Sequence, residues 1–372
     1  MTGRPSWFQR FLLPGLAFKA VVIGGGYATG RELAEFFLPS GPQGGLMAIT
    51  LATAIWSVVC AATFLFAQAT GSEDYRTFFR NLLGPFWPAF EAAYVFFAVL
   101  ILAVIGAAAG AIGEAVFGWP AIVGALALTG AIAGVVTFGT SAVERLFKYA
   151  SMFLYGVYGL FMLLALGAFG DRIAEAFARP TPVDGWIAGG VTYASYNMVA
   201  AVMILPVLRH LTSRRDAVAA GLLAGPLAML PAALFFVCMA AYHPQIAGEA
   251  LPSDFLLRRM ELPVFHLVFQ GMIFIALLET GVGAVHAVNE RIAHVWSRAR
   301  AGAAFPHAAR LALAAALLVG SIFIADRFGL VALIAKGYRL LAWMFLAVYV
   351  LPLMTWGVWR LATGRTGRAV AA

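Results

Sequence analysis

The sequence has little charge. Asp, Glu, Lys and Arg make up only 11% of its 372 residues, whereas hydrophobic residues make up 62%. A soluble core cannot hide that much apolar surface behind so few polar side chains. The composition therefore excludes a soluble globular domain and indicates an integral membrane protein.

Cysteines and metal-binding motifs are also scarce. Cys60 and Cys238 both lie within apolar runs, where small buried side chains are expected rather than a disulfide. The six histidines are scattered, and neither an HExxH motif, a Cys/His cluster nor a G-x-x-x-x-G-K-[ST] loop is present. We therefore expect no metal centre, no cofactor and no ATP site. No nucleophile and base stand at motif spacing, so we expect the chain not to be an enzyme.

Long apolar runs dominate the chain. About 20 apolar residues suffice for a helix to cross the bilayer core of about 30 Å. Ten runs of this kind are found, at about 11–37, 45–70, 86–113, 119–140, 146–170, 185–209, 216–241, 264–289, 308–325 and 337–360. The stretch "GLVALIAKGY", residues 329–338, is compatible with a short re-entrant helix before the last run.

Lysine and arginine are unevenly distributed between alternate loops. With ten spans, 16 of the 25 basic residues fall at the termini and in the loops on the same side. Because cytoplasmic loops carry the excess of basic residues, both termini are predicted to be cytoplasmic in a multi-pass inner-membrane protein. Topology thus explains the net charge of +8, and a nucleic-acid partner is not needed.

The connections between the runs are short, which predicts one transmembrane domain over residues 1–372. Five runs precede the polar loop "DRIAEAFARPTPVDG" and five follow it. An odd number of spans per half inverts the second half, as in transporters with inverted repeats. We expect repeat one at about 11–170 and repeat two at about 185–360.

The first run contains "IGGGYATGREL", residues 23–33, with glycines at four of seven positions. Unwound backbone at membrane depth survives only where protein, water or a ligand satisfies its polar groups. The helix end after such a break suits an anionic group, and the carbonyl end before it suits a cation. Here the glycines predict a break, whereas "GAAAGAIG", residues 106–113, is typical of close helix packing.

Two strings carry a family resemblance. "GGGYATGRELAEFF", residues 24–37, resembles the first-helix signature of YkvI-like membrane proteins, and "YASYNMVAAVMILPVL", residues 193–208, is similar to their second signature. Those proteins resemble the amino acid, polyamine and organocation (APC) superfamily. The resemblance implies an all-α integral membrane fold of ten transmembrane helices, the LeuT fold, with a 5+5 inverted repeat and discontinuous helices 1 and 6.

The resemblance also implies that residues 24–30 and about 193–198 face each other at the bilayer midplane and enclose a substrate. The string "TYASYN" has no glycine or proline, so an ordinary helix stays possible there. The expected substrate-binding residues are Gly24, Gly25, Gly26, Tyr27, Thr29, Gly30, Tyr193, Ser195, Tyr196 and Asn197.

Glu279 is the only formal charge between Glu261 and Glu290. A carboxylate at that depth costs about 3 kcal/mol, so a function is the default interpretation. It is expected to exchange a proton, to ligate Na⁺ together with Thr280, or to be a structural hydrogen-bonded acid. Lys148 is a second candidate for ion coupling, although its spacing from Glu144 also suits an ordinary i,i+4 pair.

Charged residues around the break are candidate gating groups. Arg31 and Glu35 are four residues apart and suited to an ion pair, which leaves Glu32 to face an outer vestibule. A solvated polar face is the alternative for all three. Lys19 is expected either to snorkel to the cytoplasmic interface or to latch an inner gate.

These features together predict a secondary transporter that moves a small amino acid or organic amine by alternating access. Coupling to H⁺ is favoured over Na⁺. The expected partners are a small-molecule substrate and the lipid bilayer, and the oligomeric state is not predicted. An ion or solute channel, or a ligand sensor without transport, is the alternative function.

Overall fold

The computed structural model describes residues 5–137, 140–300 and 305–365, and within these ranges every regular element is helical. Six described helical stretches are long and apolar enough to cross a membrane: Arg31–Thr70, Pro88–Phe117, Met152–Ala178, Arg214–Ala240, Pro263–Ser297 and His307–Ala362. A shorter apolar helix covers Ala121–Val136. The all-helical membrane character predicted from composition is therefore confirmed.

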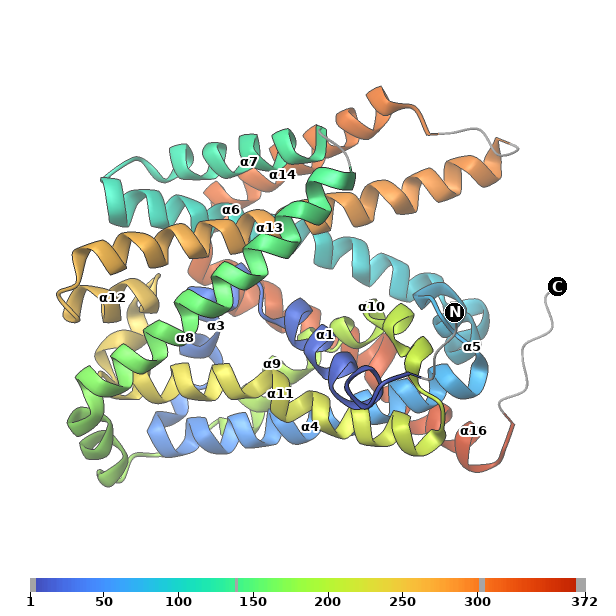
Figure 1. The fold of residues 1–372 in the computed structure, drawn as a ribbon, viewed down its shortest axis with the longest axis horizontal. Helices are drawn as coiled ribbons and strands as arrows, with labels where there is room; N and C mark the ends of the chain where they lie inside the picture. Colours follow the sequence, from blue (N-terminus) through green and yellow to red (C-terminus); the bar gives the residue numbers. More distant parts are fainter. Residues whose placement is uncertain (1–4, 138–139, 301–304, 366–372) are drawn as a thin grey trace.

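The long helices form two packed groups joined by α8 (Thr140–Ala178) (Figure 1). One group contains α6 (Pro88–Phe117), α7 (Ala121–Thr137), α13 (Pro263–Ala299) and α14 (His307–Ala332). The other contains α4 (Gly41–Thr70), α9 (Trp186–Asn197) and α11 (Arg214–Ala240). The short helix α5 (Tyr75–Leu83) lies at one end of the molecule, and α12 (Pro252–Arg259) lies at the other (Figure 1). These ends are called the α5 side and the α12 side below.

Small residues let helices approach closely within each group. A Cβ added at Gly110 of α6 would lie 2.7 Å from the carbonyl oxygen of Ala121 in α7. A Cβ at Gly124 of α7 would collide with the carbonyl oxygen of Ala109. Helix association in a bilayer depends on such packing, because lipid is as apolar as the side chains. The interpretation of residues 106–113 as a packing seam is confirmed.

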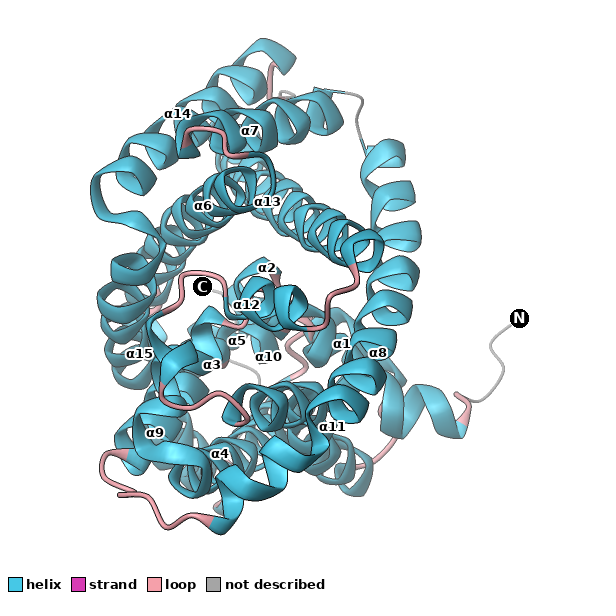
Figure 2. Cartoon of the chain, turned by 90° about the vertical axis from the view of Figure 1, so that its left-hand side faces the viewer, coloured by secondary structure: helices cyan, strands magenta, loops and turns pink. Residues whose placement is uncertain are grey.

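Three short helices run in series through the centre of the molecule: α1 (Leu13–Val22), α2 (Gly25–Ala28) and α3 (Arg31–Phe36). Helical geometry is lost at Ile23, whose ψ is 77°, and again at Gly30, whose φ is 79°. A positive φ is readily adopted only by glycine. The break predicted in the first run is therefore present, and Figure 2 shows this region and α12 surrounded by the longer helices.

The second expected break is much weaker. Helix α9 ends at Asn197 and α10 (Val199–Met203) begins two residues later. The intervening Met198 keeps helical angles, with φ −62° and ψ −20°, and its N–H donates to the Ser195 carbonyl at 3.3 Å. Only one turn is tightened before a 3₁₀ segment, Leu205–His210. The absence of glycine and proline from this stretch explains why the helix hardly opens.

The last part of the chain differs from the predicted run boundaries. Helix α14 continues through Phe328, and the backbone leaves helical geometry at Gly329, with φ 69° and ψ 165°. The chain then resumes as π-helical turns and enters α15 (Arg339–Phe345). The last helix thus begins soon after the kink, so the idea of a separate re-entrant helix at residues 329–338 is wrong. The π-helical turns span Leu333–Tyr338. The remaining described segments are three short 3₁₀ helices, Leu38–Ser40, Gly84–Phe86 and Gln245–Gly248, together with Phe8–Leu12, Leu346–Val350, Leu353–Gly357 and α16 (Val358–Ala362).

Candidate functional site

A cavity of about 430 Å³ lies beside the break in the first run. Its wall is formed by the last turn of α1 with Gly24, by α6, α9, α10 and α13, and by Tyr338. Most of the wall is aromatic or aliphatic, and polar side chains contribute at a few positions. This size and composition are typical of sites for small organic molecules. We call it the central cavity.

Glu32 lines the central cavity, and its side chain is held by Tyr196. The Tyr196 hydroxyl donates to Glu32 Oε2 at 2.5 Å, and Glu32 is only 6% exposed. The prediction that Glu32 faces an outer vestibule is therefore wrong. Neighbouring helical residues differ by about 100° around the axis, so the contacts of Arg31 on the α12 side turn Glu32 toward α9.

Glu279 and Thr280 of α13 line the same cavity. The Thr280 hydroxyl donates to the Ala276 carbonyl at 2.9 Å, and a Cβ added at Gly24 would lie 3.3 Å from Thr280 Oγ1. The break and α13 therefore meet, as a cation site built from both would require. Lys148 lies in a part of α8 whose side chains are outside the described residues.

Three of the residues expected to bind substrate line the central cavity, namely Gly24, Tyr196 and Asn197. Tyr193 is instead fully buried behind them, with its ring centroid 4.6 Å from that of Phe37. Ser195 donates its hydroxyl to the carbonyl of Val191 in its own helix, at 2.6 Å. Only one face of α9 can meet the cavity, so the string 193–197 divides between cavity and core.

The expected binding residues around the break are likewise divided between the cavity wall and the packed core. Gly25 and Gly26 begin α2. Tyr27 is fully buried, and its ring lies 6.2 Å from that of Tyr158 between centroids. A Cβ at Gly30 would lie 2.8 Å from the Phe235 ring, so this glycine provides close packing as well as a turn.

Several wall residues were not predicted from the sequence. Tyr94, Phe97 and Ile101 of α6 and Met203 of α10 line the central cavity, as does Tyr338. Apolar side chains surround α6 on all sides, so periodicity cannot show which face meets a ligand. No local sequence pattern marks Tyr338 as a wall residue, because the kink at Gly329 determines the direction of the helical segment that carries it.

Buried polar contacts close the α12 side of the break. The guanidinium of Arg31 donates to the carbonyls of Ala247 and Glu249, at 2.7 and 2.9 Å, and to the Glu35 carboxylate at 2.7 Å. The backbone N–H of Ser253 donates to the Thr29 carbonyl at 3.0 Å. We call these contacts the outer seal.

The burial of the outer seal decides between the two earlier interpretations. The side chain of Arg31 is 5% exposed and that of Glu35 is 18% exposed. A solvated polar face is therefore wrong for this segment, and the ion pair expected from the i,i+4 spacing is present. Lys19 lies elsewhere, with Nζ 4.4 Å from the ring centroid of Tyr155 in α8.

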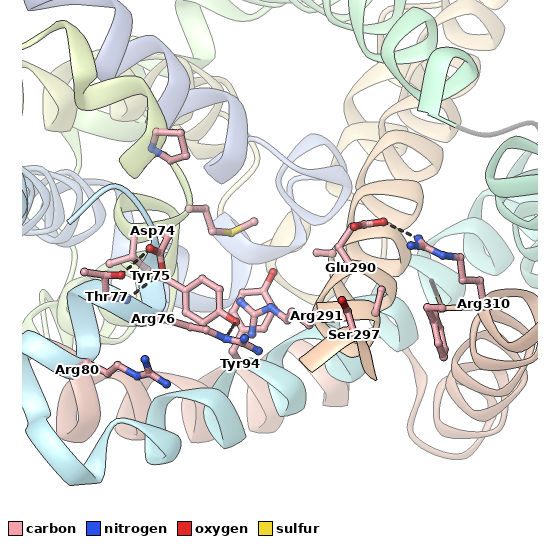
Figure 3. A pocket seen from close by; sticks show the side chains of 16 residues that line it. Asp74, Tyr75, Arg76, Thr77, Arg80, Tyr94, Glu290, Arg291, Ser297 and Arg310 are labelled. Carbon is pink, nitrogen blue, oxygen red and sulfur yellow. Dashed lines mark hydrogen bonds and ion pairs between the residues drawn. The ribbon is translucent and has the colours of Figure 1, made fainter. Parts of the chain in front are cut away.

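A second, larger cavity of about 910 Å³ lies on the α5 side (Figure 3). We call it the vestibule. Its rim includes the exposed residues Thr77 and Arg80. Inside it, the guanidinium of Arg291 lies 3.3 Å from the Tyr94 ring centroid and 4.0 Å from that of Tyr75 (Figure 3). These contacts join α5, α6 and α13.

Comparison with known proteins adds a relative and a fold. No protein-family model matches the chain. The membrane protein YkvI of Bacillus subtilis, itself uncharacterised, is 22% identical over 282 residues, which is 74% of this chain and 80% of that protein. The chain is similar in sequence to this membrane protein.

Solved structures show that the chain has the LeuT fold. MhsT in complex with L-phenylalanine matches with a TM-score of 0.56 and 16% identity over 95% of this chain and 89% of MhsT. A manganese transporter of Eremococcus coleocola gives 0.55 and 15%, covering 92% of this chain and 77% of its own. The inward-facing conformation of Mhp1 gives 0.55 and 16%, with 90% and 76% covered.

Access to the central cavity is one-sided. The central cavity and the vestibule share Tyr94 and Met203, so the two spaces adjoin. On the opposite side, the outer seal and the segment that carries α12 cover the break. The structure thus has a cavity at the helix break that is approached from the α5 side.

Proposed function

We propose that this protein is a secondary transporter that moves a small amino acid or organic amine across the membrane by alternating access. In this proposal, ten helices cross the inner membrane in one transmembrane domain. Two inverted repeats of five helices face each other, and both termini and the α5 side are cytoplasmic. The structure then corresponds to the state that is open toward the cytoplasm.

The observation that carries the proposal is the one-sided approach to a cavity at a broken helix. A channel conducts through a path that is open at both ends at once. Here the vestibule adjoins the central cavity on one side, and buried contacts of Arg31 close the other. A site that is closed on one side and approached from the other suits alternating access better than a pore.

The relatives support the same class of function. MhsT, which is described in complex with an amino acid, shares the fold of this chain. The cavity of about 430 Å³ is large enough for a molecule of that size. Among the described residues, no group of three or more His, Cys, Asp or Glu side chains is arranged to hold a metal ion.

Counterflow into proteoliposomes tests the transport proposal. Liposomes preloaded with unlabelled substrate are expected to accumulate labelled substrate faster than empty ones, and uptake is expected to saturate. Ohmic single-channel currents would show a channel instead. Ligand binding without any flux would show a sensor.

We further propose that Glu279 couples transport to a proton. A carboxyl group beside the broken helix that is neutral when protonated can carry H⁺ across with the substrate. Glu279→Gln is expected to abolish uptake driven by a pH gradient while substrate binding survives. Glu114→Gln, an exposed change in the same bilayer-spanning set of helices, is the control and leaves uptake intact. Unchanged pH-driven uptake by Glu279→Gln contradicts the coupling proposal, and dependence on Na⁺ would favour a cation site with Thr280.

A further inference from the structure

The charge of the central cavity narrows its ligand class. Among the described residues that line it, the ionisable ones besides tyrosine are Glu32, Glu279 and His286, and neither lysine nor arginine is included. At these described positions, a carboxylate-bearing ligand would therefore meet two acidic side chains and, apart from His286, no basic side chain to pair with. Burying an unpaired charge costs several kcal/mol, so such a wall selects against anionic groups.

The helix break presents its carbonyl end to the cavity. The last turn of α1, from Ala20 to Ile23, lines the wall together with Gly24. The C-terminal end of a helix carries a partial negative charge, which suits a cation. This end adds to the negative character of the wall.

Three backbone donors around the break are engaged within the chain. The Gly24 N–H donates to the Val22 carbonyl at 2.9 Å, and the Gly30 N–H donates to the Tyr27 carbonyl at 3.0 Å. The Arg31 N–H donates to the Thr29 hydroxyl at 3.3 Å. Of α3, only Glu32 reaches the wall. These three amides are therefore not free to bind a substrate carboxylate.

Glu32 stands instead in a setting that suits an ammonium group. Its carboxylate accepts the Tyr196 hydroxyl, and the rings of Tyr196 and Tyr338 lie 4.6 Å apart between centroids. All three side chains line the cavity. Aromatic faces beside a carboxylate attract organic cations by cation–π and charge interactions together. Phe97 and Ile101 of α6 also line the cavity and give it an apolar surface that suits a hydrocarbon body.

From this arrangement we infer that the central cavity takes a hydrophobic organic amine without a carboxylate, with its ammonium group at Glu32, Tyr196 and Tyr338. The inference rests on the proposed function, because it names the substrate class of the same site. Of the two substrate classes in that proposal, it retains the organic amine and excludes the amino acid, which carries a carboxylate.

Three probes with one apolar body test the inference: phenethylamine, L-phenylalanine and 3-phenylpropionate. Binding to the full chain in detergent is measured by thermal shift and calorimetry, since a ligand stabilises the folded state that binds it. We expect phenethylamine to bind at least about 10-fold more tightly than phenylalanine, and 3-phenylpropionate to give no shift. The series uses the unmodified protein, so it does not depend on how a variant folds.

Glu32→Gln then locates the ammonium group. It keeps an acceptor for Tyr196 but removes the charge, and we expect it to weaken phenethylamine binding at least about 10-fold. Glu114→Gln, on α6 and exposed, is the matched control and leaves the affinity unchanged. Equal loss in both variants, or no loss in Glu32→Gln, overturns the placement at Glu32.

Failure of the inference and failure of transport give different results. Phenylalanine or 3-phenylpropionate binding as tightly as the amine overturns the inference, and so does the absence of a shift with every probe. If the inference fails in either way but phenylalanine shows counterflow, the transport proposal still stands. Amine binding without counterflow supports the inference and contradicts transport.

Discussion

Arg31 is expected to hold the α12 side closed. Arg31→Ala removes three hydrogen bonds from a charged donor, to the Ala247 and Glu249 carbonyls and to the Glu35 carboxylate. Hydrogen bonds that involve charged groups contribute about 1.5–3 kcal/mol each, but neighbouring contributions are not additive. We therefore expect a loss of about 3 kcal/mol from the closed state, which is about two orders of magnitude in the opening equilibrium.

Amide hydrogen exchange of residues 245–255 measures this equilibrium directly. The segment contains the Ser253 N–H, which is bonded to Thr29, and the Glu249 N–H, which is bonded to Ile246. Exchange there is expected to become about 100-fold faster in Arg31→Ala, because opening exposes these amides. Arg31→Lys keeps the charge but lacks the planar guanidinium. Its exchange rate is expected to lie between those of Arg31→Ala and the unmodified protein.

Arg179→Ala is the matched control for this experiment. Arg179 also pairs with a glutamate four residues away, Glu175, but the two side chains are 72% and 61% exposed. Exposed pairs contribute about 0.2–1 kcal/mol, so exchange should rise less than about fivefold. If Arg31→Ala accelerates exchange no more than Arg179→Ala does, the outer seal does not depend on burial of the arginine and the reasoning is refuted.

Two further predictions concern stability in detergent. Asp216→Asn is expected to lower the free energy of unfolding by about 1–3 kcal/mol, because Arg10 donates to both oxygens of this 4%-exposed carboxylate; an unchanged thermal midpoint would count against this. Gly124→Ala is expected to cost a similar amount, because its Cβ would collide with the Ala109 carbonyl. Gly130→Ala on the same helix has no atom within 4 Å of its Cβ and is the control, so equal midpoints for the two glycine variants would contradict the seam.

The break in the first helix could be predicted from the sequence for a local reason. The consecutive glycines at residues 24–26 lower the cost of leaving helical geometry at membrane depth, and the positive φ of Gly30 shows that a glycine is also needed for the turn before α3. The weaker second disturbance follows the same rule, since Met198 has neighbours without glycine or proline and keeps helical angles.

The orientation of Glu32 could not be predicted, because distant contacts determine it. Arg31 meets the carbonyl of Ala247, which lies 216 residues further along the chain. That contact fixes the rotation of α3, and the rotation places Glu32 on the cavity. Local spacing could indicate the pairing of Arg31 with Glu35, but it contained no information about the partner segment.

The residues that form the cavity walls could not be predicted from the sequence, for a different reason. Tyr94 and Phe97 belong to a helix that is apolar all round, so no face of it is marked in the sequence. Which face meets a ligand depends on the crossing of α6, α10 and α13. Glu279 could be singled out because a single charge in an apolar run is conspicuous whatever the packing.

The hydrogen bond from Ser253 to Thr29 joins two backbones, and this makes the outer seal robust to evolution. Most side-chain substitutions at either position leave both partners of this bond in place, since every residue except proline supplies an N–H. The side-chain contacts of Arg31, in contrast, can be changed by substitution of that residue in related sequences. The backbone bond thus keeps the α12 segment beside Thr29 in the closed state whatever side chains stand there, while substitutions at Arg31 adjust how readily the α12 side opens.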